Sequence, residues 1–514
     1  LGTGVMGAQI AAHLTNAKIP VLGFDISQEV AEKGVAASAK LKPSAYYNPK
    51  TVEMITALNY DDHIEQISEC DWIIEVIAER LDWKQDLYSK IQPHLKKDAI
   101  ITSNTSGISA AELISKMDDD MAKRFFITHF FNPPRYMRLV EIISSEKTDT
   151  NIIPQMAEFL EDTLGKGVVY AKDTPNFIAN RIGVYGMMVT LEEARKKKLS
   201  IEDVDGLTGS LIGRPKSATF RTADVVGLDT MCFVANTAYE KCTNDPERET
   251  FKIPDYLQKM VDNEWLGQKS KQGFYKKIDK GVIHSIDLNT LEYSPQNKKR
   301  YGGVRIAKEH ANSNNRLKAL INSNDIAGEF IWEITSQALL YSADKLGKIA
   351  DDIVNIDRAM RWGFGWEKGP FQVWDAIGVK ESIKRMKDDN KIIPAWVTEM
   401  LASGNDTFYK QLDGFNCYWD TNKKDHLDKV RGLGYKKDDL LRFGAPAEIV
   451  PQHQLDFELP GYAWDLLPFK TKPLDLYRSH FWHANYNHEI RTPFAAIYTS
   501  LGCSFQCSFC MINI

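Results

Sequence analysis

Short apolar runs separated by amphipathic segments organise the first part of the chain. Runs of strand length occur at residues 19–24, 71–77, 99–102, 124–128 and 139–143. Helical patterns, such as the one at 27–40, lie between several of them. Strands that alternate with helices are typical of a parallel sheet covered by helices on both faces. Residues 1–172 are therefore predicted to form a doubly wound α/β domain.

The pattern becomes helical after Asp173, and the same order of segments then occurs twice. The first set comprises residues 176–198, 201–205 and 220–227, and the second comprises 330–346, 351–357 and 369–378. Asp357 matches Asp205, and Gly378 matches Gly227. We predict two copies of one all-helical unit, at residues 173–276 and 277–430, with a lysine- and asparagine-rich linker at 276–326. Chance similarity between two helical stretches is the alternative.

Composition points to a large soluble protein. The 514 residues are 43% hydrophobic and 26% charged, which suits several domains rather than one core. The net charge of −5 and a pI near 6.2 argue against a nucleic-acid partner. No apolar run approaches the roughly 20 residues that span a bilayer, so a cytoplasmic protein is expected. Because the chain opens on Leu1 rather than on a methionine, it is expected to be a fragment.

The first glycine-rich segment has the spacing of a dinucleotide site. Gly2, Gly4 and Gly7 precede a helical pattern, and Asp25 ends the next apolar run. Such glycines let a pyrophosphate approach a helix N-terminus, and the acid accepts from the ribose 2′-hydroxyl, which favours NAD over NADP. A chance glycine turn is the alternative. Only Leu1 remains of the strand that should precede Gly2, so the first strand is expected to be truncated and the domain weakened.

Two polar residues and one polar segment lie at or within apolar runs and are candidates for chemistry. His129 ends one run and Glu141 lies in the next, so the imidazole and the carboxylate should be within reach of each other. A carboxylate on one ring nitrogen would fix the tautomer of a histidine that acts as a general base. A structural histidine beside a solvated glutamate is the alternative. Residues 103–106, Ser-Asn-Thr-Ser, could face a ligand at the edge of the sheet or cap the helical segment at 110–114.

Together these motifs resemble the L-3-hydroxyacyl-CoA dehydrogenases of fatty-acid β-oxidation, particularly the long bacterial members. The resemblance covers residues 1–430 and is carried by the glycine motif with Asp25, by residues 103–106, 129–133 and 139–141, and by residues 172–181. It implies a Rossmann-type NAD-binding domain followed by two helical domains of the family's C-terminal type. It further implies NAD as cofactor, an acyl-CoA substrate and a homodimer formed through the helical domains.

The resemblance also assigns roles to individual residues. His129 would be the general base and Glu141 its partner, while Ser106 and Asn180 would line the substrate. Positions near the cofactor would be Glu79, Lys84, Asn132 and Lys269. In the second helical copy Trp332 and Glu333 replace Asn180 and Arg181, so that copy is expected to have lost substrate chemistry. The family's CoA contacts in the helical segment after Asp25 do not align here. A related hydroxyacid dehydrogenase of the β-hydroxyisobutyrate kind would use a lysine as base, and the His/Glu pair argues against it.

Cysteine usage separates the C-terminal tail from the remainder of the chain. Cys70, Cys232, Cys242 and Cys417 are scattered, as expected of reduced thiols, whereas Cys503, Cys507 and Cys510 cluster. Their CxxxCxxC spacing resembles the cluster loop of radical S-adenosylmethionine enzymes with an upstream cobalamin-binding region. That resemblance implies a [4Fe-4S] cluster and S-adenosylmethionine within residues 431–514, as an incomplete site. The alternative function is thus an iron-sulfur fragment fused to an inactive dehydrogenase-like scaffold. A partial zinc site or chance clustering of the three thiols is the alternative to that resemblance.

Overall fold

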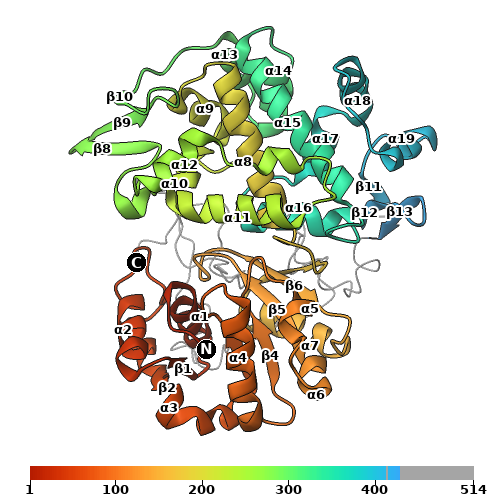
Figure 1. Cartoon of the computed structure of the whole chain (residues 1–514). Helices are drawn as coiled ribbons and strands as arrows, with labels where there is room; N and C mark the ends of the chain where they lie inside the picture. Colours follow the sequence, from red (N-terminus) through yellow and green to blue (C-terminus); the bar gives the residue numbers. More distant parts are fainter. Residues whose placement is uncertain (413–414, 429–514) are drawn as a thin grey trace, which may run out of the picture. The chain divides into compact units, whose positions relative to one another are not determined.

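The computed structural model of the chain describes residues 1–412 and 415–428 (Figure 1). The N-terminal part is an α/β domain whose strands lie in two groups. β1 (Val21–Asp25) pairs with β2 (Ile55–Asn59) in parallel. A five-stranded sheet has the order β3-β4-β5-β6-β7 and comprises Trp72–Glu75, Ile100–Ser103, Phe125–Phe130, Leu139–Ser144 and Gly167–Ala171. β5 and β6 are antiparallel, and the other neighbours are parallel.

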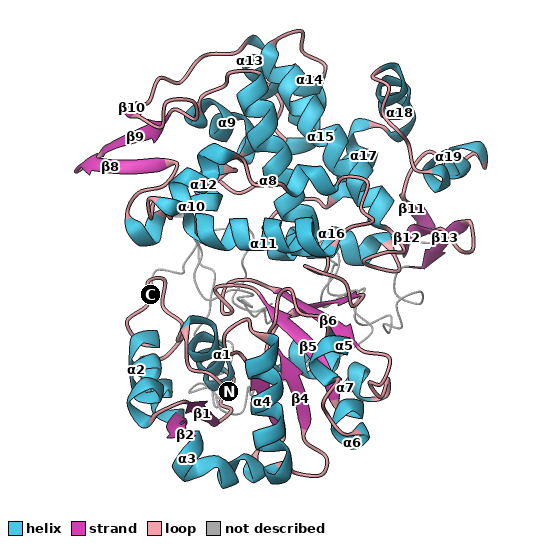
Figure 2. Ribbon diagram, in the orientation of Figure 1, coloured by secondary structure: helices cyan, strands magenta, loops and turns pink. Residues whose placement is uncertain are grey.

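The helices of this domain include those predicted after Gly7, at 27–40 and at 110–114. They are α1 (Val5–Asn16), α2 (Gln28–Ser38), α3 (Tyr60–His63), α4 (Leu81–Ile91), α5 (Ala110–Ile114), α6 (Asp119–Lys123) and α7 (Ile152–Glu158). Figure 2 shows them around the magenta strands. The alternation of side chains along β5 explains why both faces of the sheet are covered. Phe125 and Ile127 pack with α4 and α5, while Phe126 and Phe130 pack with α1 and α7.

Leu1 and Gly2 lie between the two groups of strands. The amine of Leu1 donates to the Ile74 carbonyl at 2.6 Å, and the Leu1 carbonyl accepts from Val76 N at 2.8 Å. On the other side, Gly2 N donates to the Phe24 carbonyl at 2.7 Å. Leu1 and Gly2 thus lie where a doubly wound sheet has a full strand. Because these two residues do not form a strand, β1–β2 and β3–β7 remain separate sheets.

The predicted Rossmann-type domain followed by helical domains is confirmed, with one correction to the helical part. The first copy holds α8 (Ala179–Lys196), α9 (Ile201–Thr208), α10 (Phe220–Val226), α11 (Leu228–Lys241) and α12 (Asp255–Asp262). It is not all-helical, because β8 (Tyr275–Asp279), β9 (Val282–Ile286) and β10 (Tyr293–Pro295) form an antiparallel sheet after α12. The predicted linker contains these strands, together with α13 (Gly302–Lys308) and α14 (Ser313–Ile321).

The second copy repeats this order. It holds α15 (Ile326–Lys345), α16 (Ile353–Gly363), α17 (Pro370–Ile377), α18 (Val379–Asp388), α19 (Ala395–Ala402) and the sheet of β11 (Tyr409–Leu412), β12 (Phe415–Asp420) and β13 (Asp425–Asp428). This copy is likewise not all-helical, since it too closes on three antiparallel strands. Trp332 donates to Asp389 at 2.6 Å, and Glu333 pairs with Lys391. Both replacements for Asn180 and Arg181 therefore serve packing within the copy.

Buried aspartates show that the two copies share one design. Asp205 accepts from Phe220 N at 2.7 Å and from the Tyr275 hydroxyl at 2.8 Å. Asp357 accepts from Phe371 N and from the Tyr409 hydroxyl, both at 2.8 Å. Burial raises the pKa of Asp205 to about 6 and that of Asp357 to about 7. The match between Asp205 and Asp357 that the sequence predicts is therefore supported by equivalent hydrogen bonds to a backbone N–H and to a tyrosine hydroxyl.

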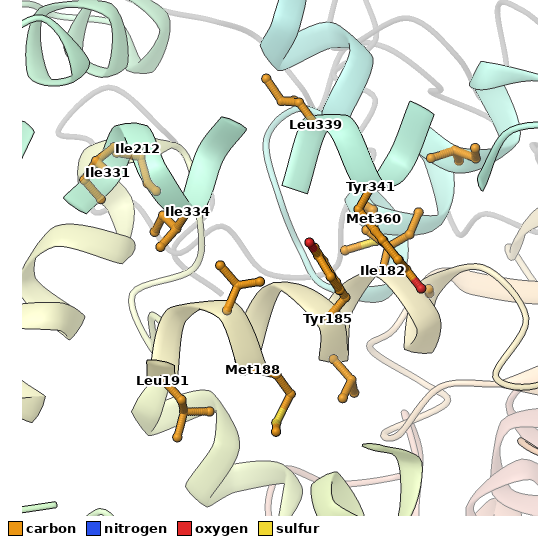
Figure 3. Close-up of a cluster of buried hydrophobic side chains, with 14 of the residues drawn as sticks. Ile182, Tyr185, Met188, Leu191, Ile212, Ile331, Ile334, Leu339, Tyr341 and Met360 are labelled. Atoms are coloured by element: carbon orange, nitrogen blue, oxygen red, sulfur yellow. The ribbon is translucent and has the colours of Figure 1, made fainter. Parts of the chain in front are cut away.

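The two copies pack through α8 and α15 (Figure 3). Ile182, Tyr185 and Met188 of α8 belong to one buried cluster with Ile334 and Tyr341 of α15. The rings of Tyr185 and Tyr341 stack with centroids 3.7 Å apart. This apolar face of α8 is thus covered within the chain, and a homodimer through the helical domains would need another surface. Within the described part of the chain, no helix combines the length and apolar character needed to cross a bilayer.

Candidate active site

His129 and Glu141 form a buried pair across two strands. They are directly opposite each other in the β5–β6 register, so their side chains emerge on the same face of the sheet. His129 Nδ1 lies 2.7 Å from Glu141 Oε2. Glu141 is fully buried, and its other oxygen accepts from Ile178 N at 3.1 Å and from Ala179 N at 2.9 Å, at the start of α8. With the carboxylate at Nδ1, the ring carries its proton there and Nε2 keeps its lone pair.

An aromatic enclosure surrounds the imidazole. The ring of His129 lies 4.6 Å from that of Phe131 and 5.6 Å from that of Phe177, centroid to centroid. Asn176 and Phe177 have φ angles of 65° and 50°, a left-handed turn that bulky residues rarely adopt. The Asn176 side chain holds this turn by donating to the Val234 carbonyl at 2.8 Å. The turn thereby places both Phe177 and the start of α8 against the His129–Glu141 pair.

Glu79 fixes the loop that carries Ser106. Glu79 Oε1 accepts from the Thr105 hydroxyl at 2.5 Å, from Ser106 N at 3.1 Å and from Gly107 N at 3.0 Å. The helix that follows is capped by Ser109, whose hydroxyl accepts from Glu112 N. Residues 103–106 therefore do not cap α5, which leaves the ligand-facing interpretation of this loop.

Lys84 belongs to a buried network that the sequence did not reveal. Its ammonium lies 2.6 Å from Glu75 Oε1, and its side chain is 1% exposed. Glu75 Oε2 accepts from the Tyr88 hydroxyl at 2.8 Å and from Ser103 Oγ at 2.6 Å. Glu75 could have been noticed as an acid that ends an apolar strand with a lysine nine residues later. The place of Lys84 beside the cofactor stays a prediction, since its contacts are with carboxylates of the protein.

A cleft of about 770 Å³ opens beside the glycine loop. Gly4 lines it, and a Cβ atom at Gly4 would meet nothing within 4 Å, whereas one at Gly7 would lie 1.9 Å from the Gly2 carbonyl oxygen. Asp25 also lines the cleft, where one oxygen accepts from Thr3 N at 2.7 Å and from the Thr3 hydroxyl at 2.8 Å. A tight turn, a bare backbone edge and an acid beside one cleft fit the requirements of a dinucleotide.

The remaining predicted residues have different surroundings. Asn132 accepts from the Gln9 side chain of α1 at 3.1 Å, which ties the segment after β5 to the helix that follows the glycine loop. Asn180 is the second residue of α8, directly after the Ala179 N–H that holds Glu141. Lys269 pairs with Asp229 at 2.5 Å in the first helical copy, and its proximity to the cofactor stays a prediction.

The predicted iron-sulfur ligands cannot be placed. Cys503, Cys507 and Cys510 lie outside the described residues, so the [4Fe-4S] and S-adenosylmethionine prediction remains untested. Within residues 1–412 and 415–428, no group of three or more metal-ligating side chains is present. In the same described residues Cys70, Cys232, Cys242 and Cys417 are not joined in disulfides, which agrees with the expected reduced thiols.

The fold and this site define a Rossmann-type dinucleotide-binding protein with a helical C-terminal part. Residues 1–174 match the family described as 3-hydroxyacyl-CoA dehydrogenase, NAD binding domain, and residues 177–277 match its C-terminal domain. A probable 3-hydroxyacyl-CoA dehydrogenase of Deinococcus radiodurans is 44% identical over 54% of this chain and 81% of its own length. The chain belongs to the 3-hydroxyacyl-CoA dehydrogenase family.

Two further relatives define the extent of the match. A probable 3-hydroxyacyl-CoA dehydrogenase of Bacillus subtilis is 47% identical over 82% of this chain, and the match spans 56% of that protein. The crystal structure of 3-hydroxybutyryl-CoA dehydrogenase from Escherichia coli has a TM-score of 0.57 and 20% identity, covering 78% of this chain and 98% of that one. This last likeness shows the fold.

Proposed function

We propose that this chain carries an NAD-dependent L-3-hydroxyacyl-CoA dehydrogenase activity of fatty-acid β-oxidation. The observation that supports it most is the buried His129–Glu141 pair, with the start of α8 fixed to the same carboxylate. Asn132 connects the segment after His129 to the helix of the glycine loop. A base, an anion that stabilises its protonated form and a dinucleotide cleft therefore lie in one domain.

The reaction follows from the charges of these groups. His129 Nε2 takes the proton of the substrate's C3 hydroxyl as hydride leaves C3, and the product is a 3-ketoacyl-CoA. NAD, when bound in the cleft at Gly4 and Asp25, supplies the hydride acceptor. Glu141 stabilises the imidazolium that forms, and general-base help of this kind contributes on the order of 10² to 10⁴-fold.

Ser106 and Asn180 would orient the substrate. Ser106 is held by the Glu79 carboxylate through its backbone, so its hydroxyl remains available for a ligand. Asn180 follows the residue whose N–H binds Glu141, and its amide can donate to the developing C3 carbonyl oxygen. Lys84 and Glu79 support this arrangement by fixing the serine loop, and Lys269 completes the proposed set of cofactor-side residues.

The test is a His129→Gln variant of the full chain. Turnover of L-3-hydroxybutyryl-CoA should fall at least about 100-fold, because the base is lost. The dissociation constant for NAD should stay within twofold, since the Gly4 cleft is intact. His310→Gln, at an exposed histidine, is the matched control and should leave turnover unchanged. Near-normal turnover of His129→Gln would refute the assignment.

The cysteine spacing in the tail favours a second candidate function, an iron-sulfur fragment of the radical S-adenosylmethionine type fused to a silent dehydrogenase scaffold. Anaerobic reconstitution with iron and sulfide would then give a brown protein, and Cys507→Ala would abolish the colour.

A homodimer and a cytoplasmic location complete the proposal. Sedimentation of the full chain tests the dimer, which would be contradicted by a monomer at micromolar concentration.

A further inference from the structure

A second cleft, of about 610 Å³, lies in the first helical copy and is lined by five cationic side chains. They come from five separate segments: the loop before α10, the first turn of α10, the turn after α12, strand β8 and the segment before α13. The residues are Lys216, Arg221, Lys271, Lys277 and Lys298. None of them forms an ion pair with any residue in the described ranges 1–412 and 415–428. Their positive charge is therefore gathered around one space, where Arg221 donates to Gln268 Oε1 at 2.9 Å and interacts electrostatically with Asp224.

The acidic residues that line this cleft are already engaged by the chain. Asp224 accepts from Phe274 N and Tyr275 N at 2.8 and 3.0 Å, and Glu202 accepts from Ser285 Oγ and Asn297 N, both at 2.7 Å. Asp205 takes three backbone N–H groups and the Tyr275 hydroxyl. These carboxylates hold the walls together, whereas the five cationic residues are exposed.

The second helical copy shows that the cations are not needed for the fold. Arg221 of the first copy and Gln372 of the second occupy equivalent positions. The backbone N–H of Arg221 binds Asp205 as that of Gln372 binds Asp357. The bonds of Asp224 and Asp375 likewise align Tyr275 with Tyr409. Lys277 is then matched by Gln411. The turn with Lys271 lies within residues 263–274, whereas only residues 403–408 connect α19 to β11. The scaffold is thus kept without the charges of Arg221, Lys271 and Lys277.

We propose that this cleft binds a phosphorylated ligand of nucleotide size. Arginine and lysine side chains are the usual partners of phosphate oxygens, and the volume lies within the range of small-molecule sites. Two sources supply this chemistry: a free nucleotide, or the nucleotide end of an acyl-CoA. The second source rests on the proposed function. Four of the five cationic residues lie between residues 214 and 280. None of the residues proposed for catalysis lines this cleft, so it is separate from the proposed catalytic residues.

The test is calorimetric titration of the full chain with ADP and with CoA, at low ionic strength and with NAD saturating the glycine-loop cleft. The variant carries Arg221→Gln and Lys277→Gln, the residues of the second copy. It should bind the effective ligand at least about tenfold more weakly, because two charge-assisted phosphate contacts are lost. The control carries Lys280→Gln and Lys410→Gln, which remove the same charge outside the cleft and should change affinity less than twofold.

The outcomes separate the two sources by binding alone. A free nucleotide is indicated if ADP binding falls in the cleft variant while CoA binds the variant and the parent equally. The CoA end is indicated if CoA binding falls in the cleft variant while ADP does not bind. The proposal is overturned if neither ligand binds the parent chain, or if the cleft variant and the control lose affinity equally. An inactive dehydrogenase would leave this binding test unaffected.

Discussion

Replacing Glu141 by glutamine tests the His129–Glu141 pair without changing its shape. One carboxylate oxygen accepts from two backbone N–H groups, at 3.1 and 2.9 Å, and the other contacts His129 Nδ1 at 2.7 Å. The amide oxygen of glutamine must stay on the two N–H donors, since an NH₂ group there would face like donors. The NH₂ group then points at Nδ1, which has to become an acceptor. The proton of the ring moves to Nε2, the nitrogen proposed to act as base.

The expected loss follows from this wrong tautomer. An equivalent change in a serine protease triad lowers kcat by about 10⁴-fold, so a loss of roughly 10³ to 10⁴-fold is expected for Glu141→Gln. Exchange of a charged for a neutral acceptor should also cost about 1–3 kcal/mol of unfolding free energy. NAD affinity should remain unchanged, because Glu141 does not line the glycine-loop cleft.

The assay is NADH absorbance with L-3-hydroxybutyryl-CoA as the substrate, together with urea unfolding and NAD binding. Glu146→Gln, at an exposed glutamate just after β6, is the matched control and should behave as the parent. A kcat for Glu141→Gln within threefold of the parent would show that the carboxylate does not set the tautomer. The reasoning about the base would then fail.

Three further predictions concern the cofactor loop, a buried ion pair and a buried acid. Gly4→Ala should fold normally yet bind NAD at least about tenfold more weakly. Gly7→Ala should also lose stability, because its Cβ would lie 1.9 Å from the Gly2 carbonyl oxygen. Thermal unfolding and NAD titration of the two variants check this prediction. Arg181→Met should lower the free energy of unfolding by about 3 kcal/mol, since the side chain of its partner Asp245 is 2% exposed. The control Arg195→Met, at an exposed arginine, should lower it by less than about 1 kcal/mol. Equal losses of unfolding free energy, measured by urea denaturation, would contradict this prediction. Asp357 has a folded pKa of about 7 against 3.8 unfolded, so its contribution to stability rises as pH falls from 8 to 5.5. The destabilisation by Asp357→Asn should therefore be about 2 kcal/mol larger at pH 5.5 than at pH 8, and a pH-independent difference would refute the assignment.

Local patterns were enough to predict most of the fold. The apolar runs predict β3, β4, β5 and β6, and the repeat of Asp205 at Asp357 predicts the second copy. The sequence missed β2, β7 and the small sheets after α12 and α19. Residues 275–279 combine two lysines with an aspartate, so their strand pairing depends on β9 rather than on an apolar pattern. Partners distant in sequence decide such elements.

The same distinction holds for the candidate site. His129 and Glu141 are twelve residues apart on adjacent strands, so their contact could be predicted from the elements alone. Glu75 could be noticed as an acid at the end of an apolar strand, but its contacts could not be predicted, because Lys84, Tyr88 and Ser103 come from other elements. The left-handed turn at Asn176 also has no local signal, since the contact with Val234 holds it.

The most direct measurement of the central claim is NADH formation by the full chain from NAD and L-3-hydroxybutyryl-CoA. The proposed roles of His129 and of the cleft at Gly4 predict steady NADH formation with the L-enantiomer and at least about tenfold less with the D-enantiomer, whose C3 hydroxyl would point away from the base. No NADH above the level of a substrate-free reaction, from chain that binds NAD, would contradict the claim.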